Sequence, residues 1–319
     1  MKKIAVLTTG GDAPGMNPAI RSVVRYGISQ KLEVAGVFRG WWGLINEELK
    51  TLNHRSVSGI IGQGGTILKT ARCAEFRTEE GQNRAFETVK KNNIDGLVVI
   101  GGNGSFAAAH EFYKKFNIPS VGVAASIDND VNGIDYTIGT DTAINTALDA
   151  IDKIRDTATS MERIFVVEVM GRESGFIALT VALAGGCEDV IIPEKALDLN
   201  AVCHDIVHGN LVGKMSWIIV LAEGAGKADD IARQIKDMTG LETRTVVLGH
   251  VQRGGRPTAV SRDLALHLGK AAVDALIAGK TDIALGYSAG RIVEVSFEQA
   301  IMKKKIELEH FHDLIKTLT

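Results

Sequence analysis

The chain has 319 residues, which is too long for one typical hydrophobic core and predicts two domains. Hydrophobic residues make up 45% of the sequence and charged residues 23%, the proportions of an ordinary soluble globule. The formal net charge of −2 argues against a nucleic-acid-binding protein, because such proteins usually carry a basic excess.

The cysteines and the apolar runs indicate the cellular compartment of the protein. Cys73, Cys187 and Cys203 are far apart and form no CxxC pair, which favours neither a zinc site nor a disulfide framework. The first apolar run, at residues 4–7, is too short for a signal peptide, and no window approaches the 18 apolar residues of a membrane span. We therefore expect a cytoplasmic protein with no membrane partner.

The chain opens with a strand, a glycine-rich turn and a helix. The apolar run at 4–7 leads into the turn at residues 8–17, and a helical pattern follows through Val24. This arrangement points backbone N–H groups at a phosphate, although the turn matches neither GxGxxG nor GxxxxGK[ST]. A second strand is expected at 32–38, and the Trp41 ring that follows it could stack on a base or simply pack.

Two arginines lie in the next loop. Arg72 and Arg77 follow paired glycines, and the guanidinium group matches phosphate geometry. The alternative is a surface ion pair with Glu75, Glu79 or Glu80.

The segment at 121–130, VGVAASIDND, carries a hydroxyl and two carboxylates just past the end of an expected strand. In an open parallel sheet, ligands bind at the carboxyl ends of the strands. Ser126, Asp128 and Asp130 could therefore hold a divalent metal and deprotonate an alcohol. The alternative is an ordinary turn, because Asp and Asn side chains cap their own backbone.

Strands continue to alternate with helices to about residue 290. Helices are expected at 79–92, 107–116 and 141–156, and at least five apolar strands end in glycine plus a polar group. This alternation predicts an α/β fold of doubly wound, mainly parallel sheets with helices on both faces. Complementary chemistry at several strand ends predicts a site in the crevice of one or two such sheets.

Eight segments, in order, resemble the motifs of the bacterial ATP-dependent 6-phosphofructokinases. They are LTTGGDAPGMN at 7–17, GGTILKTARCAEF at 64–76, VVIGGNGS at 98–105, SIDND at 126–130, DAIDKIRDTATS at 149–160, VVEVMGRESG at 166–175, AGGCE at 184–188 and LGHVQRGG at 248–255. The resemblance implies transfer of the ATP γ-phosphoryl to the 1-hydroxyl of fructose 6-phosphate, a glycolytic reaction that uses Mg²⁺.

The same resemblance implies two Rossmann-like domains that face each other across an active-site cleft. Residues 1–138 with 252–304 would bind the nucleotide, and residues 139–251 with 305–319 would bind the sugar phosphate.

The resemblance also assigns catalytic roles. Asp128 is implied as the general base toward the sugar hydroxyl, and Asp130 as part of the network that holds Mg²⁺. Ser126 stands where the family usually has threonine and would serve the transferring phosphoryl group. The implied catalytic set is completed by Arg72, Arg172 and Gly11, which suit charge neutralisation and positioning.

Binding roles follow in the same way. The implied sugar-phosphate ligands, besides Ser126, Asp128 and Arg172, are Met170, Gly171, Glu223, His250 and Arg253, with Arg163 and Arg244 from a neighbouring subunit. A homo-oligomer, by resemblance a tetramer, is therefore expected. The implied nucleotide ligands are Gly11, Trp41, Arg72, Cys73, Arg77, Gly102, Asn103, Gly104 and Ser105. Taken singly, His250 could be a structural histidine, Glu223 a helix N-cap, and the two neighbouring-subunit arginines surface charges.

Two departures concern the phosphoryl donor. Asn103 replaces the family's usual aspartate, and because an amide brings no charge, we expect a weakened Mg·ATP site. A catalytically weak regulatory paralogue is the alternative that this residue favours. Gly104 is kept and Ala125 is small, which favours ATP over the pyrophosphate used by some relatives, although the Ala125 methyl could crowd the nucleotide.

A third departure concerns regulation by ADP or phosphoenolpyruvate at a second site. Its implied ligands are Arg21, Arg25, Arg155, Glu188 and Lys214. However, His54 and Val212 stand where basic side chains are typical. We expect weakened effector control, since each charge-assisted contact can contribute roughly 1.5–3 kcal/mol.

Overall fold

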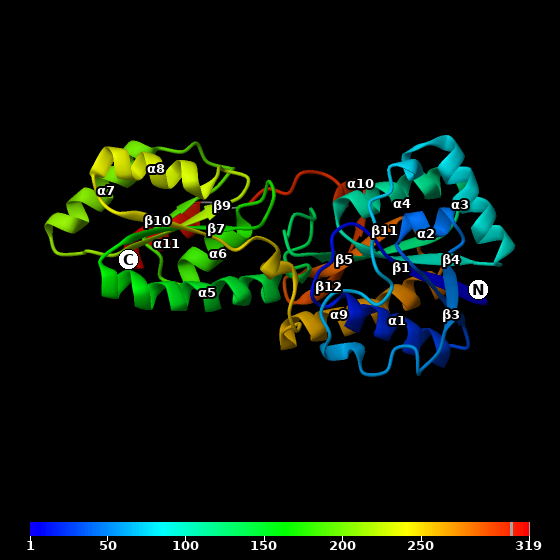
Figure 1. The fold of residues 1–319 in the computed structure, drawn as a ribbon. Coiled ribbons are helices and arrows are strands. Elements are labelled where there is room, and N and C mark those ends of the chain that lie inside the picture. The colour runs from blue at the N-terminus through cyan, green and yellow to red at the C-terminus, as the bar shows by residue number, and fades with distance from the viewer. Residues whose placement is uncertain (307–308, 319) are drawn as a thin grey trace. The chain divides into compact units, whose positions relative to one another are not determined.

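The computed structural model describes residues 1–306 and 309–318 (Figure 1). The chain forms two compact units, which are treated separately here. Unit 1 comprises Met1–Thr142 and Arg253–Lys304, and unit 2 comprises Ala143–Gln252 and Lys305–Thr319. One boundary falls within the long helix α5 (Thr140–Met161). Residues 307, 308 and 319 of the second predicted domain lie outside the described residues.

Unit 1 is built on a mainly parallel sheet. Its strand order over the described residues is β12-β11-β5-β4-β1-β2-β3, with β6 paired to β5. The strands are β1 (Lys3–Thr8), β2 (Glu33–Val37), β3 (Leu49–Leu52), β4 (Gly96–Gly101), β5 (Ser120–Ser126), β6 (Ile138–Gly139), β11 (Ile283–Ser288) and β12 (Arg291–Ser296). Only the outer pairs β2–β3 and β11–β12 are antiparallel among these strands. Every residue of β4 is buried, as expected for a parallel strand covered on both faces.

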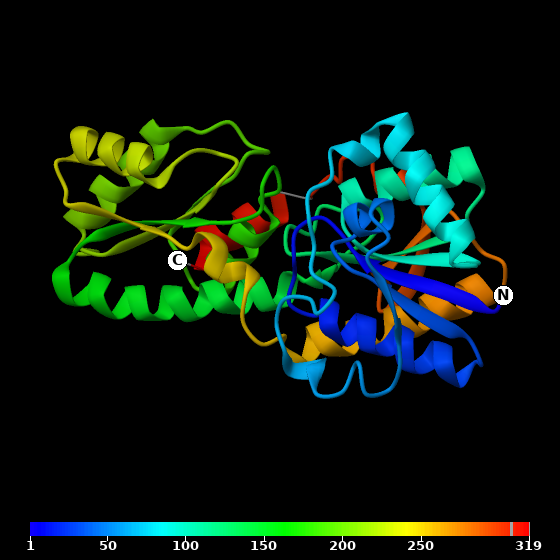
Figure 2. The same cartoon turned by 45° about the vertical axis from the view of Figure 1, so that its right-hand side comes forward.

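Helices cover both faces of this sheet (Figure 1 and Figure 2). On one face, α1 (Met16–Ser29) packs against α9 (Ala259–Ile277). The other face carries α2 (Trp41–Ile45), α3 (Glu79–Lys91), α4 (Asn103–Phe116) and α10 (Phe297–Ala300). Two 3₁₀ turns lie in connecting loops: η1 (Ile60–Gly62) contacts α1, and η2 (Glu75–Arg77) contacts α2 and α3.

Helix α4 begins four residues earlier than the expected start at Ala107. Gly102 is extended and precedes the first turn, and Phe106 in that turn is fully buried. Burial of this ring favours helix from Asn103 onward, although glycine and asparagine are weak helix formers. Residues 103–105 therefore belong to a helix N-terminus rather than to the expected loop.

Unit 2 contains a parallel sheet whose order over the described residues is β10-β7-β9-β8. The strands are β7 (Ile164–Val169), β8 (Asp189–Ile191), β9 (Trp217–Ala222) and β10 (Thr243–Val247), and the turn η3 (Gly249–Arg253) follows β10. The helices α7 (Leu199–Leu211) and α8 (Ala228–Thr239) cover one face, and α5, α6 (Phe176–Ala184) and α11 (Glu309–Leu318) cover the other (Figure 1). The predicted α/β class with mainly parallel sheets is confirmed.

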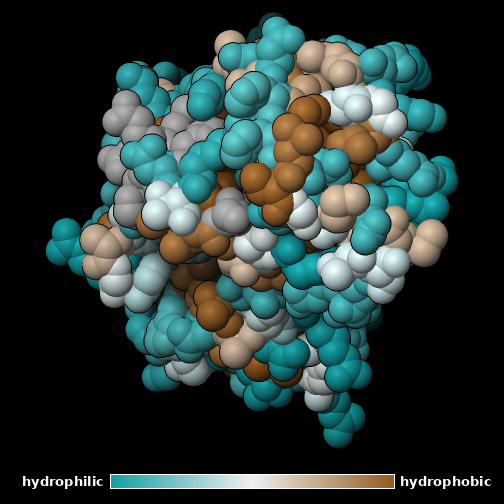
Figure 3. Space-filling model, turned by 90° about the vertical axis from the view of Figure 1, so that its left-hand side faces the viewer, coloured by the Kyte–Doolittle hydropathy of each residue, from teal (hydrophilic) through white to brown (hydrophobic). Residues whose placement is uncertain are grey.

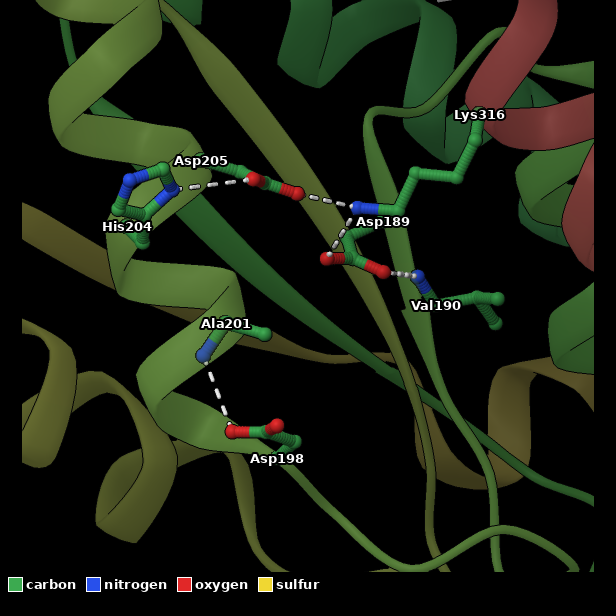
Figure 4. Close-up of polar contacts among 7 residues, drawn as sticks. All are labelled: Asp189, Val190, Asp198, Ala201, His204, Asp205 and Lys316. Atoms are coloured by element: carbon green, nitrogen blue, oxygen red, sulfur yellow. Dashed lines mark hydrogen bonds and ion pairs between the residues drawn. The ribbon is translucent and has the colours of Figure 1, made fainter.

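Lys316 joins the C-terminal helix to two carboxylates of unit 2 (Figure 4). The Nζ atom of Lys316 lies 2.6 Å from the Asp205 carboxylate and 3.4 Å from that of Asp189. Asp189 is only 5% exposed, and its carboxylate also accepts a hydrogen bond from the Val190 N–H. Lys316 therefore balances a buried negative charge, which fixes the end of the chain to β8 and α7.

No helix within residues 1–306 and 309–318 is long and apolar enough to cross a lipid bilayer.

Candidate active site

Three strand-end loops of unit 1 meet at one edge of its sheet. Strand β4 lies between β1 and β5 and is parallel to both, so the three carboxyl ends are neighbours. The Ser105 hydroxyl donates to the Thr9 carbonyl over 3.0 Å, and the Asn103 amide donates to the Asp130 carbonyl over 2.9 Å. The fold therefore brings together residues predicted from three separate motifs.

The segment after β5 is a tight turn organised by Ser126. Its hydroxyl accepts a hydrogen bond from the Asp128 N–H at 3.2 Å and lies 3.3 Å from the Asp130 carboxylate. Its carbonyl accepts hydrogen bonds from the Thr137 and Thr140 hydroxyls. Asp128 is 2% exposed. This segment is therefore a turn in which side chains bond the backbone, as the alternative interpretation predicts. The same turn holds two carboxylates at the sheet edge.

Asn103 and Asp130 are the residues that could hold a divalent cation. The Asn103 Oδ1 atom is buried and has no hydrogen-bond partner among the residues that the structure describes. Its amide donor, in contrast, is used by the Asp130 main chain. Within the described ranges, no three His, Cys, Asp or Glu side chains form a metal-binding group. An orphaned oxygen beside one carboxylate fits Mg²⁺, which usually takes one or two protein ligands and completes its shell with phosphates and water.

Gly11 and Arg253 are in close contact. A Cβ atom on Gly11 would lie 2.6 Å from Arg253 Nη1, so a larger residue here would displace the guanidinium group from its present position. Arg253 also donates to the Asp12 carbonyl over 3.3 Å. The structure therefore places an arginine beside the first glycine-rich turn, where it adds positive charge.

Gly104 lies at the start of α4 and faces open space. A Cβ atom at this position would meet no described atom within 4 Å, so the fold itself does not require glycine. The Ser105 and Phe106 N–H groups donate to the Gly102 carbonyl, which leaves the first two N–H groups of the helix, those of Asn103 and Gly104, to bind a phosphate. Ala125, by contrast, is 1% exposed, so its methyl lies inside the protein and the concern that it crowds a nucleotide is not supported.

Arg72 and Arg77 are exposed and remain available to a ligand. Neither forms an ion pair with any residue in the described part of the chain. Glu75, one of their suggested partners, instead pairs with Arg84 over 2.5 Å. The ion-pair alternative therefore does not describe this loop. The neighbouring Cys73 is half-buried, and this burial raises the pKa of its thiol.

Trp41 needs a corrected assignment. Its side chain is 4% exposed, and its ring stacks on Phe76 with centroids 4.3 Å apart and also contacts Phe112. Of the two alternatives, stacking on a base or packing, the structure shows packing. Helix α2 packs this ring against η2 and α4, which covers the faces of the indole. Trp41 therefore supports the loop at Phe76 through packing.

In unit 2, the loop after β7 presents Arg172. Gly171 has φ +150° and Arg172 has φ +52°, so the loop adopts a backbone that side chains rarely tolerate. The Glu223 carboxylate accepts hydrogen bonds from the N–H groups of Gly171 and Arg172 at 3.2 and 2.8 Å. Glu223 is not a helix N-cap, since Lys227 precedes α8. It holds the loop main chain and leaves the Arg172 side chain exposed.

Gln252 is a positioning residue that the sequence reasoning missed. It is fully buried, and its Oε1 accepts a hydrogen bond from the Met170 N–H at 2.8 Å. Its Nε2 donates to the Ala143 carbonyl. The signal was its place inside the LGHVQRGG motif, between His250, which is exposed, and Arg253.

Arg163 and Arg244 lie at the opposite ends of their strands from Met170 and His250. Arg163 immediately precedes β7, and Arg244 is the second residue of β10. Both guanidinium groups bind the Glu242 carboxylate, at 3.0 Å in the case of Arg163. These two arginines are therefore gathered into a cluster of their own at the amino ends of the strands.

The residues implied in regulation form local contacts. Lys214 lies 3.3 Å from the Glu188 carboxylate, which also accepts a hydrogen bond from the Ile218 N–H. Arg155 donates to the Gly186 carbonyl over 2.8 Å, next to this pair.

In unit 1, Arg21 and Arg25 are one turn apart on α1. Arg21 donates to the Val57 carbonyl over 2.7 Å. In unit 2, Val212, which replaces a typical basic residue, is 73% exposed, and Leu211 beside it in the chain is 80% exposed. Figure 3 shows one face of the molecule, on which apolar side chains are exposed among hydrophilic ones.

The chain is similar to known proteins over nearly its whole length. A model of the phosphofructokinase family matches residues 3–276. An ATP-dependent 6-phosphofructokinase of Clostridium botulinum (strain Hall) is 50% identical over 319 residues and covers all of both chains. A protein of the same name from Thermotoga petrophila is 51% identical over 305 residues, 96% of each chain.

Solved structures agree. Phosphofructokinase from Saccharomyces cerevisiae matches with a TM-score of 0.88 and 36% identity, over 94% of this chain and 45% of the yeast chain. A pyrophosphate-dependent phosphofructokinase from Marinobacter aquaeolei matches with a TM-score of 0.86 over 100% of this chain and 91% of its own. Its identity is 22%, so this similarity concerns the fold alone.

Proposed function

The chain belongs to the phosphofructokinase family, and from this we propose that it is an ATP-dependent 6-phosphofructokinase. It transfers the γ-phosphoryl of ATP to the 1-hydroxyl of fructose 6-phosphate and forms fructose 1,6-bisphosphate and ADP. The observation that carries the proposal is the meeting of three strand-end loops in unit 1, where the Asn103 amide donates to the Asp130 carbonyl and the Ser126 hydroxyl accepts from the Asp128 N–H.

Asp128 is the general base in this proposal. It accepts the proton of the 1-hydroxyl while the sugar oxygen forms its bond to the γ-phosphorus, and the bond from that phosphorus to the bridging oxygen of ADP breaks. Its buried carboxylate is fixed through the main chain by the Ser126 hydroxyl, which supports a base with one orientation. A base must lie within hydrogen-bond reach of its proton, so orientation matters as much as proton affinity.

Charge neutralisation is assigned to cationic side chains and to a helix N-terminus. Arg72 in unit 1 and, separately, Arg172 in unit 2 are exposed cations whose guanidinium groups suit phosphoryl oxygens. The first N–H groups of α4 are further donors to phosphate. Asn103 and Asp130 would hold Mg²⁺, which supplies further positive charge to the phosphate oxygens when it is bound.

ATP is favoured over pyrophosphate as the donor. Gly104 leaves space that no described side chain fills, and the buried Ala125 methyl does not obstruct it. The proposed nucleotide ligands are those of the sequence prediction, with Trp41 acting only through the packing of Phe76. We assign nucleotide binding to unit 1 and sugar-phosphate binding mainly to unit 2.

We further propose that the enzyme is a homo-oligomer, in family terms a tetramer. Strand β7 has six residues, or about 20 Å at 3.3 Å per residue, so Arg163 lies far from Met170 at its other end. Two arginines at the amino ends are therefore better placed to serve a neighbouring subunit. Edge strand β10 supports this, since its Val247 is 56% exposed. Mixing inactive Arg244→Ala and Asp128→Asn subunits should restore activity, whereas a purely local role for Arg244 predicts none.

Two assignments complete the proposal. The enzyme is cytoplasmic, which suits the free thiols of Cys73, Cys187 and Cys203. ADP or phosphoenolpyruvate binds with weakened affinity near Lys214 and Glu188, because Val212 offers no charge there. Strong inhibition by micromolar phosphoenolpyruvate would contradict this.

The deciding experiment is steady-state turnover of fructose 6-phosphate with Mg·ATP or Mg-pyrophosphate, with Asp128→Asn as the control. Turnover with ATP alone, abolished in the control, supports the proposal. Turnover with pyrophosphate would mean that Gly104 and Ala125 were misinterpreted. If neither donor works while fructose 6-phosphate still binds, Asn103 has disabled the nucleotide site and a regulatory paralogue becomes the better interpretation.

A further inference from the structure

The last segment of unit 1 docks against the loop that follows Asp128. Val131 and Lys303 form an isolated antiparallel bridge. The Asn132 N–H donates to the Ala300 carbonyl, and its side-chain amide donates to the Gln299 carbonyl over 3.1 Å. The loop is therefore held by a segment about 170 positions away in the sequence.

Lys304 ends this segment with its ammonium group inside the loop. Its Nζ lies 3.0 Å from the Asn129 carbonyl, 2.7 Å from that of Ile134 and 3.4 Å from that of Asp135. An ammonium group has three N–H donors, so all three can serve main-chain carbonyls of this one loop. Burial lowers the pKa of Lys304 to about 8, and the Asp135 and Asp130 carboxylates partly offset this by favouring the charged form.

The contact to Asn129 matters most, because this residue separates Asp128 from Asp130. Asn129 has φ +52°, and its side chain bonds the Asp135 carbonyl and the Thr137 N–H. The peptide that follows Asn129 carries the carbonyl that Lys304 binds. Rotation of this peptide would turn Asp130 and the carbonyl that Asn103 binds, and it would move the residue to which Asp128 is joined.

We propose that Lys304 is a positioning residue for phosphoryl transfer, whose ammonium group fixes the loop at 129–135 and thereby orients Asp128 and Asp130. Its catalytic consequence rests on the proposed function, whereas its effect on the loop does not. Lys304 does not touch substrate in this assignment. Its ammonium group binds main-chain carbonyl groups that would otherwise need other hydrogen-bond donors.

The test compares Lys304→Met with Lys303→Met. Lys303 is exposed and contributes only its main chain to the bridge, so it is a matched control. For Lys304→Met, kcat should fall about tenfold to a hundredfold, the cost of misplacing a catalytic group by about 1 Å. The KM values for fructose 6-phosphate and ATP should stay within about threefold, because the phosphate-binding arginines are untouched. Lys304→Arg, which keeps charge and donors, should recover part of kcat.

Hydrogen–deuterium exchange supplies a readout that does not depend on activity. In Lys304→Met, the amides of residues 126–137 should exchange faster than in the wild type, while the amides of β4 should exchange at the wild-type rate. In Lys303→Met, no amide should exchange faster than in the wild type. An inactive wild-type enzyme would refute the proposed function, and exchange would still decide the role of Lys304. Unchanged loop exchange, unchanged kcat, or a loss confined to KM would each overturn the proposal. If Lys304→Met unfolds throughout, Lys304→Gln must show the same kcat loss with native exchange elsewhere, or the proposal is rejected.

Discussion

Replacing Asn103 with aspartate tests the metal site most directly. The Asn103 amide now donates to the Asp130 carbonyl over 2.9 Å, while its Oδ1 has no hydrogen-bond partner among the described residues. In Asn103→Asp, a carboxylate oxygen replaces this donor and faces the carbonyl. Without a cation, the variant loses a hydrogen bond and sets two oxygens against each other, which costs about 1–3 kcal/mol. The N-terminus of α4 returns about 0.3–1 kcal/mol.

With Mg²⁺ bound, the balance reverses. A charged ligand in place of a neutral one is worth roughly 1.5–3 kcal/mol, or about a tenfold to a hundredfold gain in affinity. We therefore expect Asn103→Asp to raise kcat/KM for Mg·ATP by about tenfold or more at a fixed excess of free Mg²⁺. In EDTA, its thermal midpoint should fall by up to about 11 °C, since the net cost is at most about 2.7 kcal/mol and about 1 kcal/mol corresponds to roughly 2–4 °C for a unit of this size.

The matched control is Asn132→Asp, on the loop that carries Asp130. Asn132 also donates its amide to a carbonyl, that of Gln299 at 3.1 Å, so the change in charge and hydrogen bonding is the same. This control should lose stability with no gain in kcat/KM and no response to Mg²⁺. If Asn103→Asp behaves like the control, Asn103 does not contribute to a metal site and the weakened-site interpretation fails.

Three further predictions follow from particular contacts. Gly104→Asp should lower kcat/KM for ATP at least tenfold without lowering the thermal midpoint, since a Cβ there meets no described atom; a loss of stability would contradict this. Lys316→Met should lower the free energy of unfolding at pH 7 by about 1–2 kcal/mol, less than for a fully buried pair. The hydrogen bond from Lys316 lowers the pKa of the Asp205 carboxyl, so the contribution of this ion pair to stability is present above pH 3.8 and is lost as the pH falls further. In denaturant titrations, the difference in unfolding free energy between the wild type and Lys316→Met should therefore be smaller at pH 3 than at pH 7. Burial raises the pKa of Cys187 to about 12, so it should resist a thiol reagent at pH 8 until the protein unfolds, and rapid labelling would refute its placement.

The sequence by itself determined the fold class and the local site chemistry. Continuous apolar runs such as Gly96–Gly101 report burial on both faces, and the alternation with helical patterns reports a parallel sheet. The order of polar groups after strands placed Ser126, Asp128 and Asp130 at a sheet edge, where the structure has them. These features are local, since strand and helix periods and turn chemistry depend on near neighbours in the chain.

Tertiary structure alone decided which of these groups meet and which face solvent. The sequence does not show that Trp41 stacks on Phe76, or that Arg163 and Arg244 both bind the Glu242 carboxylate. Nor does the run of lysines near residue 304 show which one reaches the Asn129 carbonyl, 175 positions away. Such contacts depend on strand order and on the packing of helices over both faces. They join groups whose separation in the chain carries no periodic signal, so only the folded arrangement can specify them.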